Sequence, residues 1–126
     1  MPIELTIYHP DRLLIGRATG ELSITDFVKF ALEIRRADIV HYRKIIDVID
    51  AHPAFTEQEL RALVLAIREV QIGNRRRGAL AFVADPTRGK FAKLFASLDI
   101  DGRPASVFRS IHDARRWISD NPSEPG

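Results

Sequence analysis

The chain of 126 residues is long enough for one domain with a single core, and its 45% hydrophobic and 29% charged residues are typical of a soluble globular protein. It contains no cysteine, which excludes disulfides, thiolate metal sites and a cysteine nucleophile, and its formal net charge of +2 gives little attraction for a polyanion. Since no apolar run reaches the roughly 18 residues that span a bilayer and no signal peptide is recognisable, we expect a cytoplasmic protein that does not insert into membranes.

Residues 3–8 open the chain with the alternation of a half-buried strand, in which every second side chain is apolar. Residues 9–12 contain proline and aspartate, which favour a turn. The apolar run that begins at Leu13 predicts a second strand, which should end between Gly16 and Gly20. Two strands joined so tightly should be antiparallel neighbours.

A capped helix and a third strand come next. Ser23 and Asp26 have the spacing of a capping box, and the helix should end near Arg36. Helical spacing predicts an inward face made of Phe27, Ala31 and Ile34. Residues 44–50 are too apolar to form a strand that is exposed on both faces, so we expect this strand to be covered.

The second helix has the strongest local signal in the chain. A predicted loop from Asp50 to Thr56 leads into it, and Thr56 with Glu59 forms a complete capping box. The hydrophobic staple expected around this box consists of Phe55 and Leu60. Residues 79–84 follow as an unbroken apolar run, which predicts a central strand covered on both faces.

The last third of the chain predicts two helices and a strand between them. Asp85 and Pro86 fit a helix start, and apolar residues recur at helical spacing between residues 91 and 98. Residues 105–109 predict a short strand, after which Ser110 should cap the final helix. We expect the inner face of that helix to consist of Ile111, Ala114 and Ile118.

The element order is therefore β-β-α-β-α-β-α-β-α. It predicts a single small α/β domain over residues 1–120 with a flexible C-terminal tail at 121–126. The five-stranded sheet should be mostly parallel with right-handed crossovers and an antiparallel first strand, and the helices should pack on the sheet.

This order resembles the SpoIIAA-like (STAS-like) family, and in particular its uncharacterised bacterial branch. The resemblance is carried by three segments: Gly20-Glu21-Leu22-Ser23, residues 45–49 before the capped helix, and residues 107–118 with their F-x-x-x-x-x-A-x-x-W-I pattern. It implies a SpoIIAA-like fold, and a non-enzymatic regulatory or protein-interaction role, because the family includes anti-anti-sigma factors and cytoplasmic domains of anion transporters.

One departure from the family concerns its phosphorylation switch. Anti-anti-sigma factors carry a phosphorylated serine before the second helix, in a setting that also contains glycine. Residues 54–58 contain neither, and Thr56 is the only hydroxyl there. A phosphate on Thr56 would remove its capping bond, although helix N-termini favour anions. We interpret Thr56 as a structural cap, with a regulatory phosphosite as the alternative.

The segment after the third strand contains the best pair of functional side chains. Asp50 and His52 are two residues apart at the carboxyl end of the third predicted strand. Ligands usually bind at the carboxyl ends of strands in open parallel sheets, and this pair could share a metal or act as acid and base. No third ligand is evident, so we interpret them as a surface pair without chemistry, with a metal site or acid–base pair as the alternative. Asp47 should be satisfied by an arginine or by backbone amides. If the strand ends near Asp50, these two carboxylates point to opposite faces.

Two basic segments are further candidates. Arg88 and Lys90 follow the fourth predicted strand at what we interpret as a plain loop and helix start, and an anion site without the Walker A pattern is the alternative. We interpret residues 75–77 as a solvated loop, and a basic patch that they form with Arg43 and Lys44 is the alternative. Because no aromatic residues are interleaved for base stacking, we do not expect a nucleic-acid partner.

Our leading hypothesis is a non-enzymatic module without a cofactor that binds a protein partner through the second helix and the preceding loop. The candidate residues for ligand or partner binding are Asp50, His52, Thr56, Arg88 and Lys90. The alternative is a binder of a small anion, a nucleotide or a lipid-like molecule. Whether copies of the chain associate into a homo-oligomer is left open by the sequence.

Overall fold

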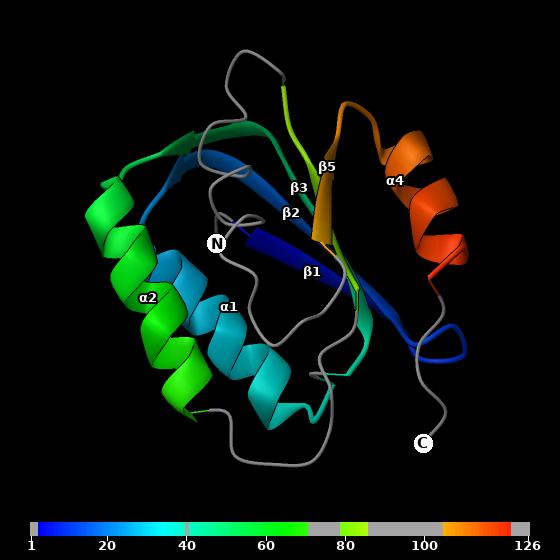
Figure 1. Ribbon diagram of the computed structural model, residues 1–126, viewed down its shortest axis with the longest axis horizontal. Helices are drawn as coiled ribbons and strands as arrows, with labels where there is room; N and C mark the ends of the chain where they lie inside the picture. Colours follow the sequence, from blue (N-terminus) through cyan, green and yellow to red (C-terminus); the bar gives the residue numbers. More distant parts are fainter. Residues whose placement is uncertain (1–2, 40, 71–78, 86–104, 122–126) are drawn as a thin grey trace.

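Five strands form one sheet in the order β1-β2-β3-β4-β5 in the computed structural model, which describes residues 3–39, 41–70, 79–85 and 105–121 (Figure 1). The strands are β1 (Ile3–Tyr8), β2 (Leu13–Leu22), β3 (Arg43–Pro53), β4 (Leu80–Val83) and β5 (Ala105–Phe108). The helices are α1 (Ile24–Arg36), α2 (Glu57–Val70) and α4 (Ile111–Ser119). β1 pairs with β2 antiparallel and the other three pairings are parallel, which confirms the predicted fold class. The helix predicted at 91–98 lies outside the described residues.

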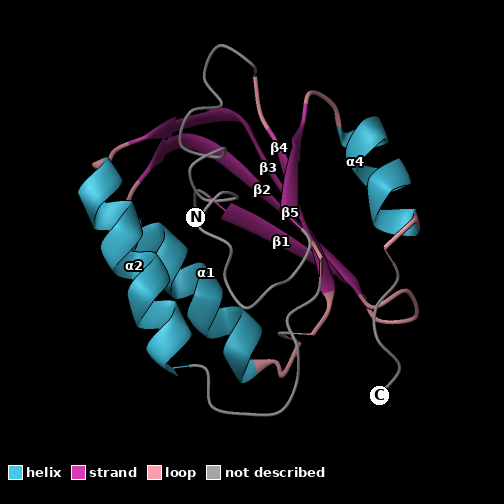
Figure 2. Ribbon diagram, in the orientation of Figure 1, coloured by secondary structure: helices cyan, strands magenta, loops and turns pink. Residues whose placement is uncertain are grey.

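The sheet separates two hydrophobic cores. α1 and α2 lie side by side on one face, and α4 covers the other face (Figure 2). Buried residues on the α1/α2 side include Leu14, Phe27, Phe30, Ile46, Leu80 and Phe82. Those on the α4 side include Leu13, Ile45, Ala81, Val83, Ala114 and Ile118. β4 contributes to both cores because successive strand residues point to opposite faces, and all four of its residues are buried as predicted. No described helix is long and apolar enough to cross a membrane.

Three helix starts have the local structure that their sequences predict. The Ser23 hydroxyl accepts a bond from Asp26 N at 3.2 Å, and the Asp26 carboxylate accepts one from Ser23 N at 2.8 Å. Thr56 and Glu59 make the same reciprocal pair at 3.1 and 2.9 Å. The Ser110 hydroxyl caps α4 by accepting from the third helical amide. Side chains within three residues of each other can satisfy these amides, so no distant contact is required.

The inner faces of two helices differ in detail from the prediction. In α1 the buried residues are Phe27, Phe30 and Ile34, while Ala31 is only half-buried. In α4 Ile111 is 38% exposed, so its assignment to the inner face was wrong. Ile111 is the first helical residue, and α4 contacts the sheet through Ala114 and Ile118 one and two turns later.

β2 and β3 are both longer than the apolar runs that predict them. β2 continues through Gly16 and Gly20 to Leu22, and β3 continues to Pro53, so the predicted loop from Asp50 to Thr56 was wrong in its first part. The extensions pair with each other, with Thr19 opposite Asp50 and Leu22 opposite Pro53. Polar residues can extend a strand in this way because the ladder bonds are made by the backbone.

Gly16 allows α1 to approach the sheet closely. A Cβ atom at this position would lie 2.9 Å from Cζ and 3.1 Å from Cε1 of the Phe30 ring. Phe30 is buried in the core between α1 and β2, so its ring cannot move without displacing other core side chains. A residue without a side chain is therefore required for the packing of α1.

We expect Gly16→Ala to lower the free energy of unfolding by about 1–3 kcal/mol, because the added methyl group overpacks the core against Phe30. Urea unfolding of the wild type, Gly16→Ala, Phe30→Leu and the double variant measures the coupling between the two positions. The double variant should be more stable than the sum of the single effects predicts. Strict additivity of the two changes would show that this contact does not limit the approach of α1.

We expect Thr56→Ala to destabilise the protein by about 1 kcal/mol, because it removes the side-chain acceptor of the Glu59 amide at the start of α2. Thr56→Ser keeps the hydroxyl and should retain most of the stability. Thermal or urea unfolding of both variants and the wild type measures these differences in stability. Equal loss in both would mean that the methyl group of Thr56, and not its cap, is what matters.

Candidate functional site

An irregularity in the β2–β3 pairing sets the geometry of the candidate site. Arg17 stands opposite Asp47 and Thr19 opposite Asp50, so β3 has one more residue than β2 in this interval. Such a bulge reverses the side-chain alternation of the longer strand beyond it. Arg17 and Thr19 share a face of the sheet, and paired residues point to the same side. Asp47 and Asp50 therefore lie on one face, and the prediction of opposite faces was wrong.

The two carboxylates nevertheless have separate partners. Asp50 makes an ion pair with Arg17, with 3.2 Å between Oδ2 and Nη2. Both side chains are more than half exposed, so this pair contributes little to stability. The Oδ1 atom of Asp47 accepts a bond from Ile49 N at 3.1 Å. This bond confirms the expectation that a backbone amide satisfies Asp47.

The bulge also decides which residues of the β3 extension are buried. Ala51 is 2% exposed and packs into the core on the α1/α2 side, whereas Asp50 and His52 are exposed. His52 stands opposite Glu21 of β2. Within the described ranges, no three His, Asp or Glu side chains are placed so that they could hold a metal ion. Asp50 and His52 thus lie side by side on a strand extension, and not in a loop as predicted.

A short and well-anchored connection joins β3 to α2. The Ala54 amide donates to Leu22 O at 2.8 Å, which ties the connection to the end of β2. The Phe55 ring packs edge-on against Phe27 of α1, with 5.7 Å between the ring centroids. The capping box of Thr56 then begins α2. The backbone of the connection is held at both ends, although most of its side chains face solvent.

We call this end of the molecule the α2 entry surface. It lies at the carboxyl ends of β2 and β3, where both strands bend toward the starts of α1 and α2 (Figure 1). It is defined by seven exposed residues, namely Glu21, Asp50, His52, Ala54, Thr56, Glu57 and Gln58. Three of the five candidate residues belong to it, Asp50 and His52 on the β3 extension and Thr56 at the start of α2. The other two, Arg88 and Lys90, lie outside the described residues, as do residues 75–77.

Two residues of the alternative basic patch, Arg43 and Lys44, make hydrogen bonds within the molecule and do not support such a patch. Lys44 is only 5% exposed, and its Nζ atom donates to Tyr42 O at 2.8 Å. The Arg43 guanidinium donates to Ile118 O at 3.0 Å and to Asp11 O at 2.6 Å. These bonds connect the end of α4 to the β1–β2 turn. Lys44 is thus buried and Arg43 is half-buried, and both cations bind carbonyl groups of the protein itself.

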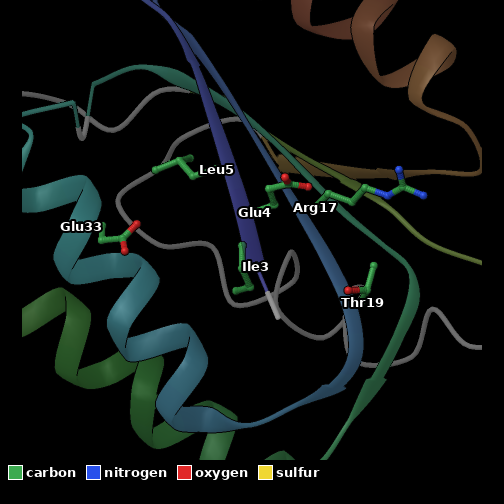
Figure 3. A pocket seen from close by; sticks show the side chains of 6 residues that line it. All are labelled: Ile3, Glu4, Leu5, Arg17, Thr19 and Glu33. Atoms are coloured by element: carbon green, nitrogen blue, oxygen red, sulfur yellow. The ribbon is translucent and has the colours of Figure 1, made fainter. Parts of the chain in front are cut away.

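An open cavity beside β1 is a feature that the sequence did not predict. Its volume is about 570 Å³, and it is lined by Ile3, Glu4, Leu5, Arg17, Thr19 and Glu33. Figure 3 shows Glu33 of α1 on the side of β1 toward which Leu5 points, with Glu4 and Arg17 on the other side. The alternation of residues 3–8 indicates a half-buried strand but not which strand forms the edge of the sheet. For this reason no local pattern could reveal the cavity.

Comparisons with known proteins support the fold and go no further. No protein-family model and no curated protein matches the sequence. Among solved structures, the chain is similar to an uncharacterized protein of the DUF3478 family with a SpoIIAA-like fold from Shewanella loihica PV-4. The TM-score is 0.61 at 16% sequence identity, and the match covers 92% of this chain and 91% of that one. The chain therefore has a SpoIIAA-like fold.

Proposed function

We propose that this protein is a non-enzymatic, cytoplasmic module that binds a protein partner through the α2 entry surface. The observation that carries the proposal is that seven exposed side chains are presented there on backbone held at several points. The strand pairing fixes Glu21, Asp50 and His52, and the capping box fixes Thr56. A surface whose backbone is already held by hydrogen bonds loses less conformational entropy on binding, which favours recognition.

The charge of this surface indicates the chemistry of the partner. Glu21, Asp50 and Glu57 are acidic and exposed, and the start of α2 carries a further acidic residue at Glu59. Asp50 and Glu57 have exposed arginine partners, whose contacts are easily exchanged in water. We therefore expect a partner that presents a basic surface. Such pairing accelerates association and makes it sensitive to salt.

Charge reversal tests the proposal directly. We expect Glu21→Lys with Glu57→Lys to weaken capture of the partner from an extract of the source cells at least tenfold, since two acidic contacts become repulsive. Tagged wild-type and variant proteins are compared by affinity purification and quantitative mass spectrometry at low and moderate salt. The wild-type protein should retain a specific partner, and less of it as salt increases.

A matched control variant carries the same change of charge outside the α2 entry surface. Asp11 and Asp120 are exposed and lie near the β1–β2 turn and the end of α4, away from the α2 entry surface. Asp11→Lys with Asp120→Lys should leave the capture unchanged. The proposal fails if both double variants lose the partner equally, or if the wild type enriches no protein over an unrelated bait. Unfolding curves establish that all variants are folded.

A further inference from the structure

β1 is an edge strand of the described sheet and lacks most of the sequence features that usually prevent edge-to-edge association. It pairs only with β2 among the described strands, in an unbroken register from Ile3 opposite Ala18 to Tyr8 opposite Leu13. Its six residues contain no proline, no lysine and no bulge, which are common protections of exposed edges, and Glu4 is their only charged side chain. The opposite edge strand, β5, has four residues and lies against α4. Within the part of the chain that the structure describes, the outward backbone groups of β1 have no strand partner and can bind another strand.

We propose that two copies of this chain form a symmetric dimer by antiparallel pairing of β1 with β1. A two-fold axis at Leu5 joins the two five-stranded sheets into one continuous sheet. Residues that stand opposite each other in an antiparallel pair point to the same face. The axis then places Leu5 opposite Leu5 of the partner subunit, and Ile3 opposite Ile7 of the partner subunit. On the other face, Glu4 stands opposite Thr6 of the partner subunit.

The residues of β1 favour this register over its neighbours. An axis at Glu4 would place the two Glu4 carboxylates directly opposite each other, which is repulsive. An axis at Thr6 would leave the apolar Ile3 opposite His9 of the partner subunit. The axis at Leu5 pairs apolar side chains on the face toward α1. It also allows the Thr6 hydroxyl to donate to the Glu4 carboxylate on the other face.

The cavity beside β1 fits the same occupant. Ile3 and Leu5 form its apolar part, with Glu33 of α1 beside them (Figure 3). In the proposed register, Ile7 of the partner subunit stands next to Ile3 on the face toward α1. Its side chain would enter the cavity beside Ile3, which is already buried, and cover the half-buried Leu5. One strand pair with its flanking side chains is a small interface, so we expect a weak dimer that depends on protein concentration.

Substitutions at Thr6 test both the dimer and its register. Thr6 is exposed, so it can be changed without disturbing the core. Thr6→Glu places two carboxylates opposite each other at two symmetric positions and should raise the dissociation constant about tenfold. Thr6→Lys places an ammonium group opposite Glu4 and should lower the dissociation constant a few-fold. Analytical ultracentrifugation from about 1 μM to about 1 mM covers the range of weak association.

Two results would overturn the dimer. One is a wild-type protein that remains monomeric over the whole concentration range. The other is a dimer whose dissociation constant shifts in the same direction, or not at all, in the two Thr6 variants. Because Thr6 is not part of the α2 entry surface, neither result bears on the partner-binding proposal.

Crosslinking provides an independent measurement of the register. The chain has no cysteine, so an introduced thiol is the only one present. Leu5→Cys puts two thiols beside the two-fold axis, where the Cα atoms of opposed residues are about 4.5–5.5 Å apart, within the range that an intersubunit disulfide spans after mild oxidation. Tyr8→Cys lies three residues from the axis and serves as the control. Equal crosslinking of the two variants, or none at Leu5→Cys, would refute the register.

Discussion

The parallel pairing of β2 with β3 is the contact on which the rest of this structure depends. It runs from Leu13 opposite Arg43 to Leu22 opposite Pro53, beyond the ends of β1 and β4. The backbone ladder sets where α1 begins and where α2 begins, because both helices follow directly from the ends of these two strands. Its bulge decides which side chains of the β3 extension face the core and which face solvent.

Single residues of β2 and β3 then determine how the helices pack on the two faces of the sheet. Gly16 lets the Phe30 ring of α1 approach the middle of β2. Arg43, at the start of β3, donates to carbonyl groups at the end of α4 and in the β1–β2 turn. A cation at the C-terminal end of a helix is favourable because the last carbonyl groups are unpaired and carry partial negative charge. The two helical layers are thus fixed to the same pair of strands from opposite sides.

The two surfaces that we propose for binding differ in chemistry and in the kind of partner they suit. The α2 entry surface is polar and acidic, and its side chains project from a backbone whose own hydrogen bonds are made. The β1 edge offers backbone groups with apolar side chains beside them, which suits another strand. They share no residue, so association through one leaves the other open. A dimer would carry two entry surfaces and so allow bivalent binding.

The sequence by itself determined the elements whose signals are local. The alternation of residues 3–8, the apolar run at 79–84, and the capping residues Ser23, Thr56 and Ser110 all predict what the structure contains. Each of these depends on residues within a few positions, whose interactions do not require the rest of the fold. The order of strands and helices followed from them, because alternating elements with right-handed crossovers leave few possible topologies.

Only the tertiary structure decided what depends on pairing between distant segments. The bulge opposite Ala18 placed Asp47 and Asp50 on one face, buried Ala51 and exposed His52. The β2–β3 and β3–β4 ladders turned Lys44 into the interior, and the position of α4 left Ile111 exposed. A strand's register is a relation between two segments, and one inserted residue reverses every side chain that follows. For that reason the residues of the candidate site were recognisable in the sequence, but the face on which they meet was not.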